Sequence, residues 1–319
     1  MSPVIQSITI KEAMSASSLP RLEVRMLLEA VLNQPRTWLI AHDDELLTEQ
    51  QVQVFYILVA RRTAGVPMAY LLGTREFMGL TFCVSPHVLI PRPDTETLVN
   101  RAIEVIKLTT QPAQKAYRVL DLGTGSGAIA ISIALACPDV MVDATDLSAQ
   151  ALATAELNAT LLKANVRFVQ GDWYQALQNL PNSFPGDGAA QNLEDHEAGI
   201  NSMTSNYQKS PLHLPSNAAI YNLIVSNPPY IASQDPHLVE GDLRFEPPQA
   251  LTDGADGLSA LTVIITQAPQ WLKPAGQLWV EHGYDQADAV KVLFEANGFK
   301  GVQTLYDIGH QPRVTGGYL

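Results

Sequence analysis

The stretch DLGTGSG, from Asp121 to Gly127, joins an apolar run at 118–122 to a helical run at 128–136. Glycines permit a tight turn here, and they let the backbone approach a ligand at the helix N-terminus, where unpaired N–H groups point outward. Asp146 follows Gly127 by nineteen residues, about the spacing at which an acid meets a ribose diol. The pattern predicts an α/β fold that binds a nucleoside-containing cofactor.

The same alternation of strand and helix patterns continues along the rest of the chain. Strands are predicted at 118–122, 140–144, 166–169, 220–225, 277–280, 303–306 and 313–317. This β-α-β order is typical of a parallel sheet with helices on both faces. With five crossover helices between the strands, we expect a seven-stranded, doubly wound α/β domain.

A second motif, Asn227-Pro228-Pro229-Tyr230, ends the apolar run at 221–226. Proline lacks an N–H and fixes φ, so the strand stops there, and Asn227 lies at the carboxyl edge where open α/β sheets place their ligands. The Asn227 amide oxygen and the Pro228 carbonyl can accept both hydrogens of a substrate NH2, while the Tyr230 ring lies against its plane. The motif indicates a site for a neutral planar nitrogen, although Asn and Pro are also common turn residues.

The glycine loop at 121–127 does not by itself decide between S-adenosylmethionine and a nicotinamide dinucleotide as the cofactor, because Gly123, Gly125 and Ala128 also satisfy the dinucleotide fingerprint. Two observations favour S-adenosylmethionine. The Asp121 carboxylate would oppose a pyrophosphate but suits an ammonium group, and the asparagine site has no role in hydride transfer. Gly171-Asp172-Trp173, after the third predicted strand, adds an acid and an indole face for adenine, although Trp173 read alone is a candidate core residue.

The chain before the glycine loop carries helical periodicity without chemical motifs. We expect a helical bundle at 1–75, a hairpin linker at 76–95, and the α/β domain at 96–319. Pro91-Arg92-Pro93 is predicted to be extended and stiff, because each proline disfavours helical backbone in its predecessor. Asp94 is then placed to cap the helix that follows.

Length and composition limit the classes of partner. The chain has 319 residues, 46% of them hydrophobic, and a formal net charge of −12. Wide binding to a nucleic acid backbone needs clustered Lys and Arg, so direct nucleic acid binding is not expected and a basic protein partner suits the charge better. With neither a signal pattern at 1–18 nor a membrane-length apolar run, we expect a cytoplasmic protein without membrane contact.

Two further groups of residues are given structural interpretations. Cys83 and Cys137 lie in apolar surroundings without metal-type spacing, which is typical of reduced packing residues. His42 precedes acids at 43–45, but sequential acids before a helix more commonly form its N-terminal turn. No metal site is therefore expected.

A polar stretch at 181–217 interrupts the α/β pattern. It is rich in Asn, Ser, Gly, Asp and Gln and almost lacks apolar periodicity, which is typical of a surface insertion that buries no core. A second interpretation stays open, because the apolar islands Leu193, Ile200, Tyr207 and Leu212 could form a lid or partner surface that orders when a substrate arrives.

Together the motifs resemble the PrmC/HemK family, the glutamine methyltransferases of peptide chain release factors. The resemblance covers nearly the whole chain, through 67–73, 75–77, 89–93, 121–127, 158–159, 171–173, 225–231, 246–247, 256–258 and 281–286. The segments at 67–73 and 91–93 make it specific, since other amino-group methyltransferases also carry Asn-Pro-Pro-Tyr. Three departures are visible: Asp94 stands where the family usually has glutamate, the 181–217 stretch is longer than usual, and the match at 307–313 is loose.

The resemblance implies a seven-stranded S-adenosylmethionine-dependent methyltransferase domain, an N-terminal domain that helps to hold the release factor, and the glutamine of a Gly-Gly-Gln loop as substrate. Asp121 and the loop Gly123-Thr124-Gly125-Ser126-Gly127 would take the methionine end of the cofactor, Asp146 the ribose, and Asp172 and Trp173 the adenine region. Asn227, Pro228 and Tyr230 would be catalytic, and Asn227 would also border the cofactor. Pro229, Pro91 and Arg92 would join them in contacting the glutamine.

An amide nitrogen is a poor nucleophile because its lone pair is delocalised. Two acceptors for its hydrogens would orient it and stabilise the developing positive charge. The methylated, cationic amide is acidic enough to lose its proton to water, so no general base is assigned, and His237 and His282 are interpreted as surface or supporting residues.

Two alternatives stay open from the residues. An amino methyltransferase acting on a nucleic acid base would see the same NH2 group, but it would need base flipping and a basic groove. A non-catalytic binding module would use the fold for protein contact alone, and the intact glycines, Asp146 and Asn227 argue against it.

Overall fold

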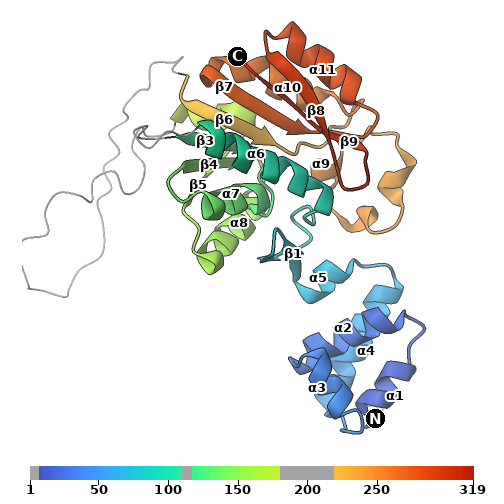
Figure 1. Cartoon of the computed structure of the whole chain (residues 1–319). Helices are drawn as coiled ribbons and strands as arrows, with labels where there is room; N and C mark the ends of the chain where they lie inside the picture. The colour runs from blue at the N-terminus through green and yellow to red at the C-terminus, as the bar shows by residue number, and fades with distance from the viewer. Residues whose placement is uncertain (1–6, 110–116, 180–218) are drawn as a thin grey trace, which may run out of the picture.

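The computed structural model describes residues 7–109, 117–179 and 219–319. A helical bundle at the N-terminus is joined by a short hairpin to a larger domain built on one sheet (Figure 1). The predicted insertion at 181–217 lies outside the described residues.

The bundle contains five short helices: α1 Ile10–Ser15, α2 Arg21–Leu32, α3 Arg36–Ala41, α4 Glu49–Thr63 and α5 Met68–Leu72. Leu27, Leu28 and Phe55 are fully buried in its core. Helix α4 begins at a capping box in which the Thr48 hydroxyl accepts from the Gln51 N–H. The acids at 43–45 therefore form a turn between two helices, and they do not cap the helix that follows.

The hairpin consists of β1 (Thr74–Phe77) and β2 (Leu80–Cys83). The 3₁₀ helix η1 (Pro93–Thr95) follows an extended segment and leads into α6 (Glu96–Thr109). The prediction that Asp94 caps α6 is wrong, because the turn already starts at Pro93 and Asp94 lies inside it without a side-chain capping bond.

The large domain alternates strands and helices, as predicted. Its strands are β3 Arg118–Leu122, β4 Met141–Asp146, β5 Val166–Gln170, β6 Tyr221–Ser226, β7 Leu272–Glu281, β8 Lys300–Tyr306 and β9 Pro312–Tyr318. Its α-helices after α6 are α7 Ala128–Ala136, α8 Ala149–Leu162, α9 Pro248–Leu251, α10 Ser259–Gln267 and α11 Ala287–Ala296. Its further 3₁₀ helices are η2 Trp173–Asn179, η3 Pro236–Val239, η4 Leu243–Phe245 and η5 Ala268–Gln270.

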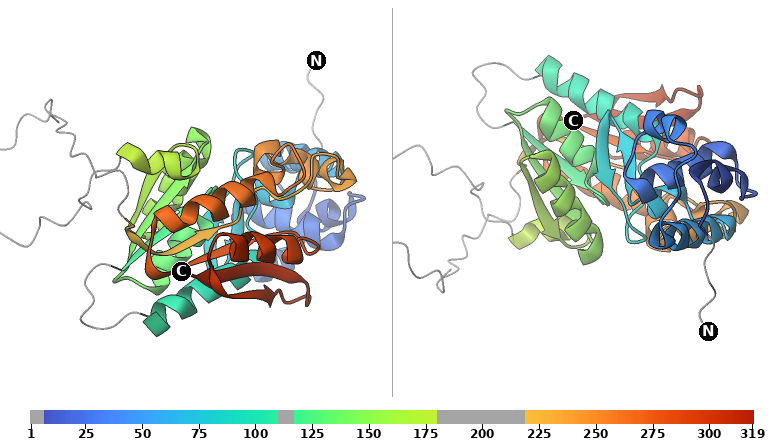
Figure 2. Two further views of the ribbon diagram at one scale, coloured as in Figure 1. Left: turned by 90° about the horizontal axis from the view of Figure 1, so that it is seen from above. Right: turned by 90° about the horizontal axis from the view of Figure 1, so that it is seen from below.

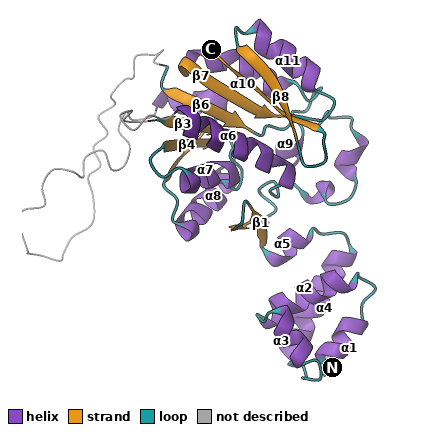
Figure 3. Ribbon diagram, viewed as in Figure 1, coloured by secondary structure: helices purple, strands orange, loops and turns teal. Residues whose placement is uncertain are grey.

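The strands form one seven-stranded sheet in the order β5-β4-β3-β6-β7-β9-β8, shown as the orange arrows of Figure 3. Strand β9 runs antiparallel to both of its neighbours, so the prediction of a wholly parallel sheet is wrong. The connection after β5 begins with the 3₁₀ helix η2, and residues 180–218 of that connection lie outside the described residues, so the number of crossover helices stays a prediction.

Helices cover both faces of the sheet (Figure 2). Alternate residues of β3 point to opposite faces, so Val119 packs in a cluster with residues of α6 and α7, while Leu120 and Leu122 pack with residues of α10 and α11. Because β3 is covered on both sides, the four residues from Val119 to Leu122 are all buried, Asp121 included, which is how a central parallel strand differs from a half-exposed one.

The strand order creates the place for a site. From β3 the chain moves outward through β4 to β5, and it then returns to the other side of β3 to form β6. Such a reversal leaves a crevice at the carboxyl ends of the two adjacent strands. Leu122, the last residue of β3, pairs with Ser226, the last residue of β6. The glycine loop and Asn227 therefore begin side by side.

Candidate active site

A cavity of about 500 Å³ opens at this crevice. It is lined by residues of the glycine loop, the carboxyl ends of β4 and β5, the extended segment before η1, and two stretches of chain after β6, at 227–229 and 247–250. The predicted site residues among them are Pro91, Arg92, Gly123, Thr124, Gly125, Ser126, Asp146, Asp172, Trp173, Asn227 and Pro229. The structure thus brings together both sequence motifs, although about a hundred residues separate them.

Asp146 is held firmly at the end of β4. Its Oδ2 accepts from the Gly125 N–H at 2.8 Å, and its Oδ1 accepts from the Ser148 N–H at 2.8 Å. Burial raises the pKa of Asp146, and these backbone N–H groups oppose that shift. The carboxylate therefore shapes the glycine loop and also borders the cavity.

Asp121 is placed differently from the prediction. It is fully buried beneath the glycine loop, where its Oδ2 accepts from the Thr124 hydroxyl at 2.7 Å, and it does not line the cavity. Burial raises its pKa to about 7, against the opposing hydrogen bonds of Thr124 and the Ala130 N–H. Its Oδ1 has no hydrogen-bond partner among the described residues. The expected direct contact with an ammonium group does not follow from this geometry.

Gly127 shows why the loop ends in glycine. Its φ is +81°, and a Cβ there would lie 2.8 Å from the Ile131 Cδ1 and 3.1 Å from the Ala155 Cβ. The end of the Ile131 side chain could turn away from a larger residue, but the Ala155 Cβ could yield only if α8 shifted, and the positive φ would add strain. Gly127 thus allows the loop to meet α7 at this position.

Trp173 forms a side wall of the cavity. A Cβ at Gly123 would come within 3.2 Å of its ring, so the glycine loop and the indole face one another closely. Its backbone has φ +40°, an uncommon conformation for a bulky residue. Its orientation supports the interpretation as a binding residue, although its ring also packs on the buried cluster beside α10.

Asn227 lies directly after β6 and borders the cavity. Its Nδ2 donates to the Thr95 Oγ1 at 3.2 Å. With the NH2 end of the amide held by Thr95, the Oδ1 atom is left to accept hydrogens from a ligand. Thr95 was not singled out by the sequence, yet it controls how this amide is turned.

Tyr230 borders a second, smaller cavity of about 70 Å³, which also touches Asn227, Pro228 and Glu281. The Tyr230 hydroxyl donates to the Glu281 Oε1 at 3.0 Å. The two cavities share Asn227 in their walls, while the glycine loop lines only the larger cavity and Tyr230 only the smaller one.

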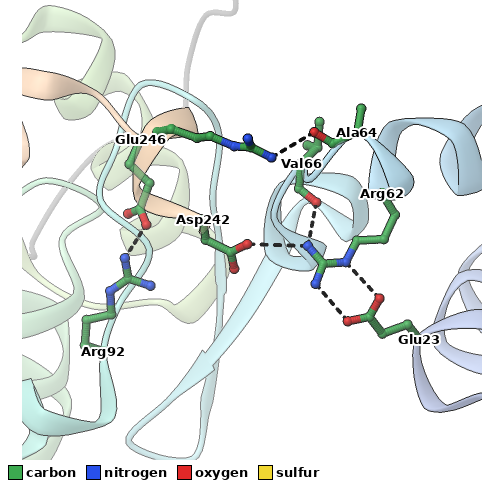
Figure 4. A network of polar contacts seen from close by, with 8 residues as sticks. Glu23, Arg62, Ala64, Val66, Arg92, Asp242 and Glu246 are labelled. Carbon is green, nitrogen blue, oxygen red and sulfur yellow. Dashed lines mark hydrogen bonds and ion pairs between the residues drawn. The ribbon is translucent and has the colours of Figure 1, made fainter. Parts of the chain in front are cut away.

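Arg92 borders both cavities and makes an ion pair with the Glu246 Oε1. The Glu246 side chain is completely buried, and its Oε2 accepts from the Ile90 N–H at 3.0 Å. This pair, shown in Figure 4, fixes the segment before η1 against the loop that follows β6. Glu246 joins Thr95 and Glu281 as residues that the sequence reasoning assigned no role.

The described residues contain neither a metal-binding cluster nor a membrane-spanning helix. Residues 7–109, 117–179 and 219–319 contain no group of three His, Cys, Asp or Glu side chains that could hold a metal ion. Within the same ranges, no helix is both long enough and apolar enough to cross a membrane.

The residues around the larger cavity fit S-adenosylmethionine. A carboxylate at the end of β4 suits a ribose diol, an indole face suits adenine, and a glycine loop with no side-chain bulk leaves room for the methionine end. At Gly125, a Cβ would meet nothing within 4 Å, which is consistent with open space for a ligand above the loop.

Two family models match the chain: the PrmC N-terminal domain over residues 9–73 and the methyltransferase small domain over residues 103–183. A release factor glutamine methyltransferase of Bordetella pertussis is 47% identical, over 97% of this chain and 99% of the relative. The proteins of that name from Neisseria gonorrhoeae and Escherichia coli are 40% and 38% identical, each over 96% of both chains. A solved methyltransferase of Pyrococcus furiosus matches at 16% identity, with a TM-score of 0.44, over 81% of this chain and 96% of that chain.

The seven-stranded fold and the paired cavities define an S-adenosylmethionine-dependent methyltransferase, as the methyltransferase domain model also indicates. Within that class, the chain belongs to the release factor glutamine methyltransferase family, the PrmC family, because its relatives match it at 38–47% identity over nearly their full length.

Proposed function

We propose that the protein transfers a methyl group from S-adenosylmethionine to the side-chain amide nitrogen of the glutamine in the Gly-Gly-Gln motif of peptide chain release factors. One observation carries the proposal: the Asn227 amide, held at its NH2 end by Thr95, stands between the cofactor-sized cavity and a small second cavity. The names of the relatives support the substrate class.

The cofactor would be held by the chain's own residues at the larger cavity. The glycine loop would accommodate its methionine end, Asp146 its ribose hydroxyls and Trp173 its adenine. When bound, S-adenosylmethionine supplies an electrophilic methyl group on a sulfonium centre.

The substrate glutamine would enter from the side of the smaller cavity. Asn227 Oδ1 and the Pro228 carbonyl accept the two hydrogens of its NH2 group, which turns the nitrogen lone pair toward the cofactor cavity. Both acceptors stabilise the positive charge that develops on nitrogen, and because they are already in place, little reorganisation is needed as the charge forms. Arg92 borders both cavities, and Pro229 borders the larger one.

The proposed partner is therefore a release factor, and the proposed location is the cytoplasm, where release factors act. A release factor is a protein substrate, so no basic groove is required. The formal charge of −12 agrees with this and opposes a nucleic acid base as the substrate.

The function is tested with the purified full chain, labelled S-adenosylmethionine, and three acceptors: a release factor, the same factor with its Gly-Gly-Gln glutamine replaced by alanine, and duplex DNA. We expect label only in the first, and mass mapping should find one added methyl group on the glutamine side chain. Equal labelling of both release factors would contradict the proposed position, and labelling of DNA alone would favour a base amino methyltransferase.

A further inference from the structure

The Asn-Pro-Pro-Tyr motif has few backbone donors of its own with which to be held in place. Pro228 and Pro229 have no N–H group, so neither can donate a hydrogen bond to a neighbouring strand or loop. The Pro228 carbonyl is assigned to the substrate and has to stay available to it. The motif therefore has to be held by other parts of the chain, and its last residue, Tyr230, makes contacts of this kind.

The hydroxyl and the backbone carbonyl of Tyr230 are both bonded to the short connection between β7 and α11. The hydroxyl donates to the Glu281 Oε1 at 3.0 Å, at the end of β7. The carbonyl oxygen accepts from the Gln286 Nε2 at 3.0 Å, directly before α11. Two residues of one connection thus hold the side chain and the backbone of the same tyrosine.

The Gln286 side chain is matched by its neighbours at both ends of its amide. Its Oε1 accepts from the Gly283 N–H at 2.8 Å, and its Nε2 donates to the Gly257 carbonyl at 3.2 Å as well as to Tyr230. A backbone N–H only donates and a carbonyl only accepts, so these three partners allow one orientation of the amide. A carboxylate has no hydrogens to donate, so it could not make the same set of contacts.

The peptide group after Tyr230 is fixed at both of its polar atoms. Gln286 holds its oxygen, while its N–H, which belongs to Ile231, donates to the Leu251 carbonyl at 3.0 Å. Gly257 also lies close against it, because a Cβ at that position, where φ is +83°, would come within 2.3 Å of the Tyr230 oxygen. This peptide group therefore has little freedom to rotate.

Proline geometry carries this constraint back to the substrate side. The Pro229 ring fixes φ between the Pro228 carbonyl and the Tyr230 carbonyl, and the Pro228 ring fixes φ on the Asn227 side. Because the peptide bonds are planar as well, few torsions in the motif can change. If the hold on Tyr230 were lost, the Tyr230 ring and the Pro228 carbonyl would be free to turn together.

We propose that Gln286 is a positioning residue of the active site, which holds the Tyr230 carbonyl and thereby fixes the Pro228 carbonyl and the Tyr230 ring against the substrate amide. This role rests on the proposed function, because both groups are the ones assigned to the substrate glutamine. Gln286 borders neither cavity, so it acts through Tyr230 and does not touch substrate or cofactor.

The position of Tyr230 can be measured without substrate. In the full chain labelled with 3-fluorotyrosine at its ten tyrosines, the ¹⁹F signal of Tyr230 is identified by its loss in Tyr230→Phe. In Gln286→Met, which keeps the length of the side chain but has no donor, this signal should shift or broaden. In the control Gln303→Met, which alters an exposed residue of β8, it should stay unchanged. A Tyr230 signal that is the same in Gln286→Met and in the wild type overturns the proposal.

Kinetics provide the second readout. Gln286→Met should lower kcat by about 10- to 100-fold, the range expected when a reacting group is slightly misplaced. Cofactor affinity should stay within a factor of about three, because Gln286 does not border the larger cavity. The value of kcat is referred to the cofactor sites that calorimetry counts, so unfolded chain does not lower it. Gln286→Asn retains the donors but is shorter, so it should show the same loss, and it decides the result if Gln286→Met does not fold.

The outcomes separate the two proposals. If the wild type transfers no methyl group to release factor, the proposed function fails, while the Tyr230 signal still decides the role of Gln286. If Gln286→Met binds cofactor and keeps the kcat of the wild type, the positioning role fails and the proposed function stands. A loss of cofactor affinity equal to the loss of kcat would identify a general structural role instead and also overturn the proposal.

Discussion

Asp146 and Asn227 both border the larger cavity at strand ends, but their side chains are held in opposite ways. Asp146 is fixed by backbone N–H groups of its own loop and the glycine loop, whereas Asn227 is fixed by a side chain from η1. A carboxylate held by backbone stays in place whatever ligand arrives, while an amide has two different ends and must be turned correctly. Cofactor affinity is therefore expected to depend on Asp146, and the rate of methyl transfer is expected to depend on Asn227.

Replacement of Asn227 with alanine removes the amide oxygen that is proposed to accept a substrate hydrogen. We expect methyl transfer to fall at least about a hundredfold, because oriented acceptors act mainly in the transition state. Cofactor affinity, measured by calorimetry, should stay nearly unchanged. A folded variant with near wild-type turnover would rule out the proposed mechanism.

Replacement of Asp146 with alanine should weaken cofactor binding by about 1–3 kcal/mol, through the loss of charge-assisted hydrogen bonds. Because Asp146 also accepts from Gly125 and Ser148, part of that loss can come from a loosened loop. Asp146→Asn retains one acceptor oxygen, so its cofactor affinity should fall less than that of Asp146→Ala. Calorimetry that shows unchanged affinity in both variants would remove Asp146 from the site.

At the residue scale, the motifs could be located from the sequence, but the side chains that hold them in place could not. Asn227 and Asp146 could be recognised because each follows a predicted strand, which is a local signal. Thr95 lies 132 residues from Asn227, and Glu281 lies 51 residues from Tyr230, so these contacts exist only once the sheet order is known. Asp121 was recognised from its sequence as part of the glycine loop. Its burial beneath that loop could not be predicted from the spacing of the motif.

At the scale of elements, the chain between η3 and α9 connects the bundle to the active site. We call residues 236–246 the bridging segment. Arg62 of α4 is paired with Glu23 of α2 through two contacts of 2.8 Å, and it also reaches Asp242 of the bridging segment at 3.4 Å (Figure 4). Arg244 donates to the Ala64 carbonyl at 3.1 Å.

The same segment ends at Glu246, whose buried carboxylate pairs with Arg92 at the cavity wall. The bundle and the substrate opening are thus joined through a few residues of one 3₁₀-helical stretch. Pairs that involve partly buried charges contribute more than exposed ones, and removal of one partner leaves the other unpaired.

Replacement of Arg62 with alanine should therefore loosen the bundle from the bridging segment. We expect faster amide hydrogen exchange across residues 236–246 and a free energy of unfolding lower by about 1–3 kcal/mol, since both Glu23 and Asp242 lose their partner. The neighbouring Arg61 is exposed, so Arg61→Ala is the matched control. Equal exchange in the two variants would show that Arg62 does not hold this junction.

At the scale of the whole molecule, periodicity and strand length were enough to predict seven strands and helices on both faces. The antiparallel β9 was missed, although the signal was present: only residues 307–311 separate β8 from β9, and a parallel connection needs a dozen or more. The division of the chain at about 75 and 95 stays a prediction, since a hairpin from Thr74 to Cys83 does not by itself define an independently folding unit.

The last prediction concerns the polar stretch at 181–217. Its flanks are described: η2 ends at Asn179 and β6 begins at Tyr221. Leu177 and Tyr221 belong to the same buried cluster, so the two flanks lie near one another. At roughly 3.3–3.6 Å per residue, about eight polar residues of extended chain reach at most about 26–29 Å.

We expect a variant with such a short replacement to differ from the wild type by only about 1–2 kcal/mol in the free energy of unfolding, because loop-closure entropy grows slowly with length. Cofactor affinity should be retained, since the residues assigned to the cofactor, which are 121–127, Asp146, Asp172 and Trp173, lie outside 181–217. Denaturant unfolding and calorimetry measure the two quantities. A variant that binds cofactor normally but shows a large rise in KM for release factor would contradict the interpretation as a passive insertion, and it would assign the apolar residues of this stretch to substrate contact.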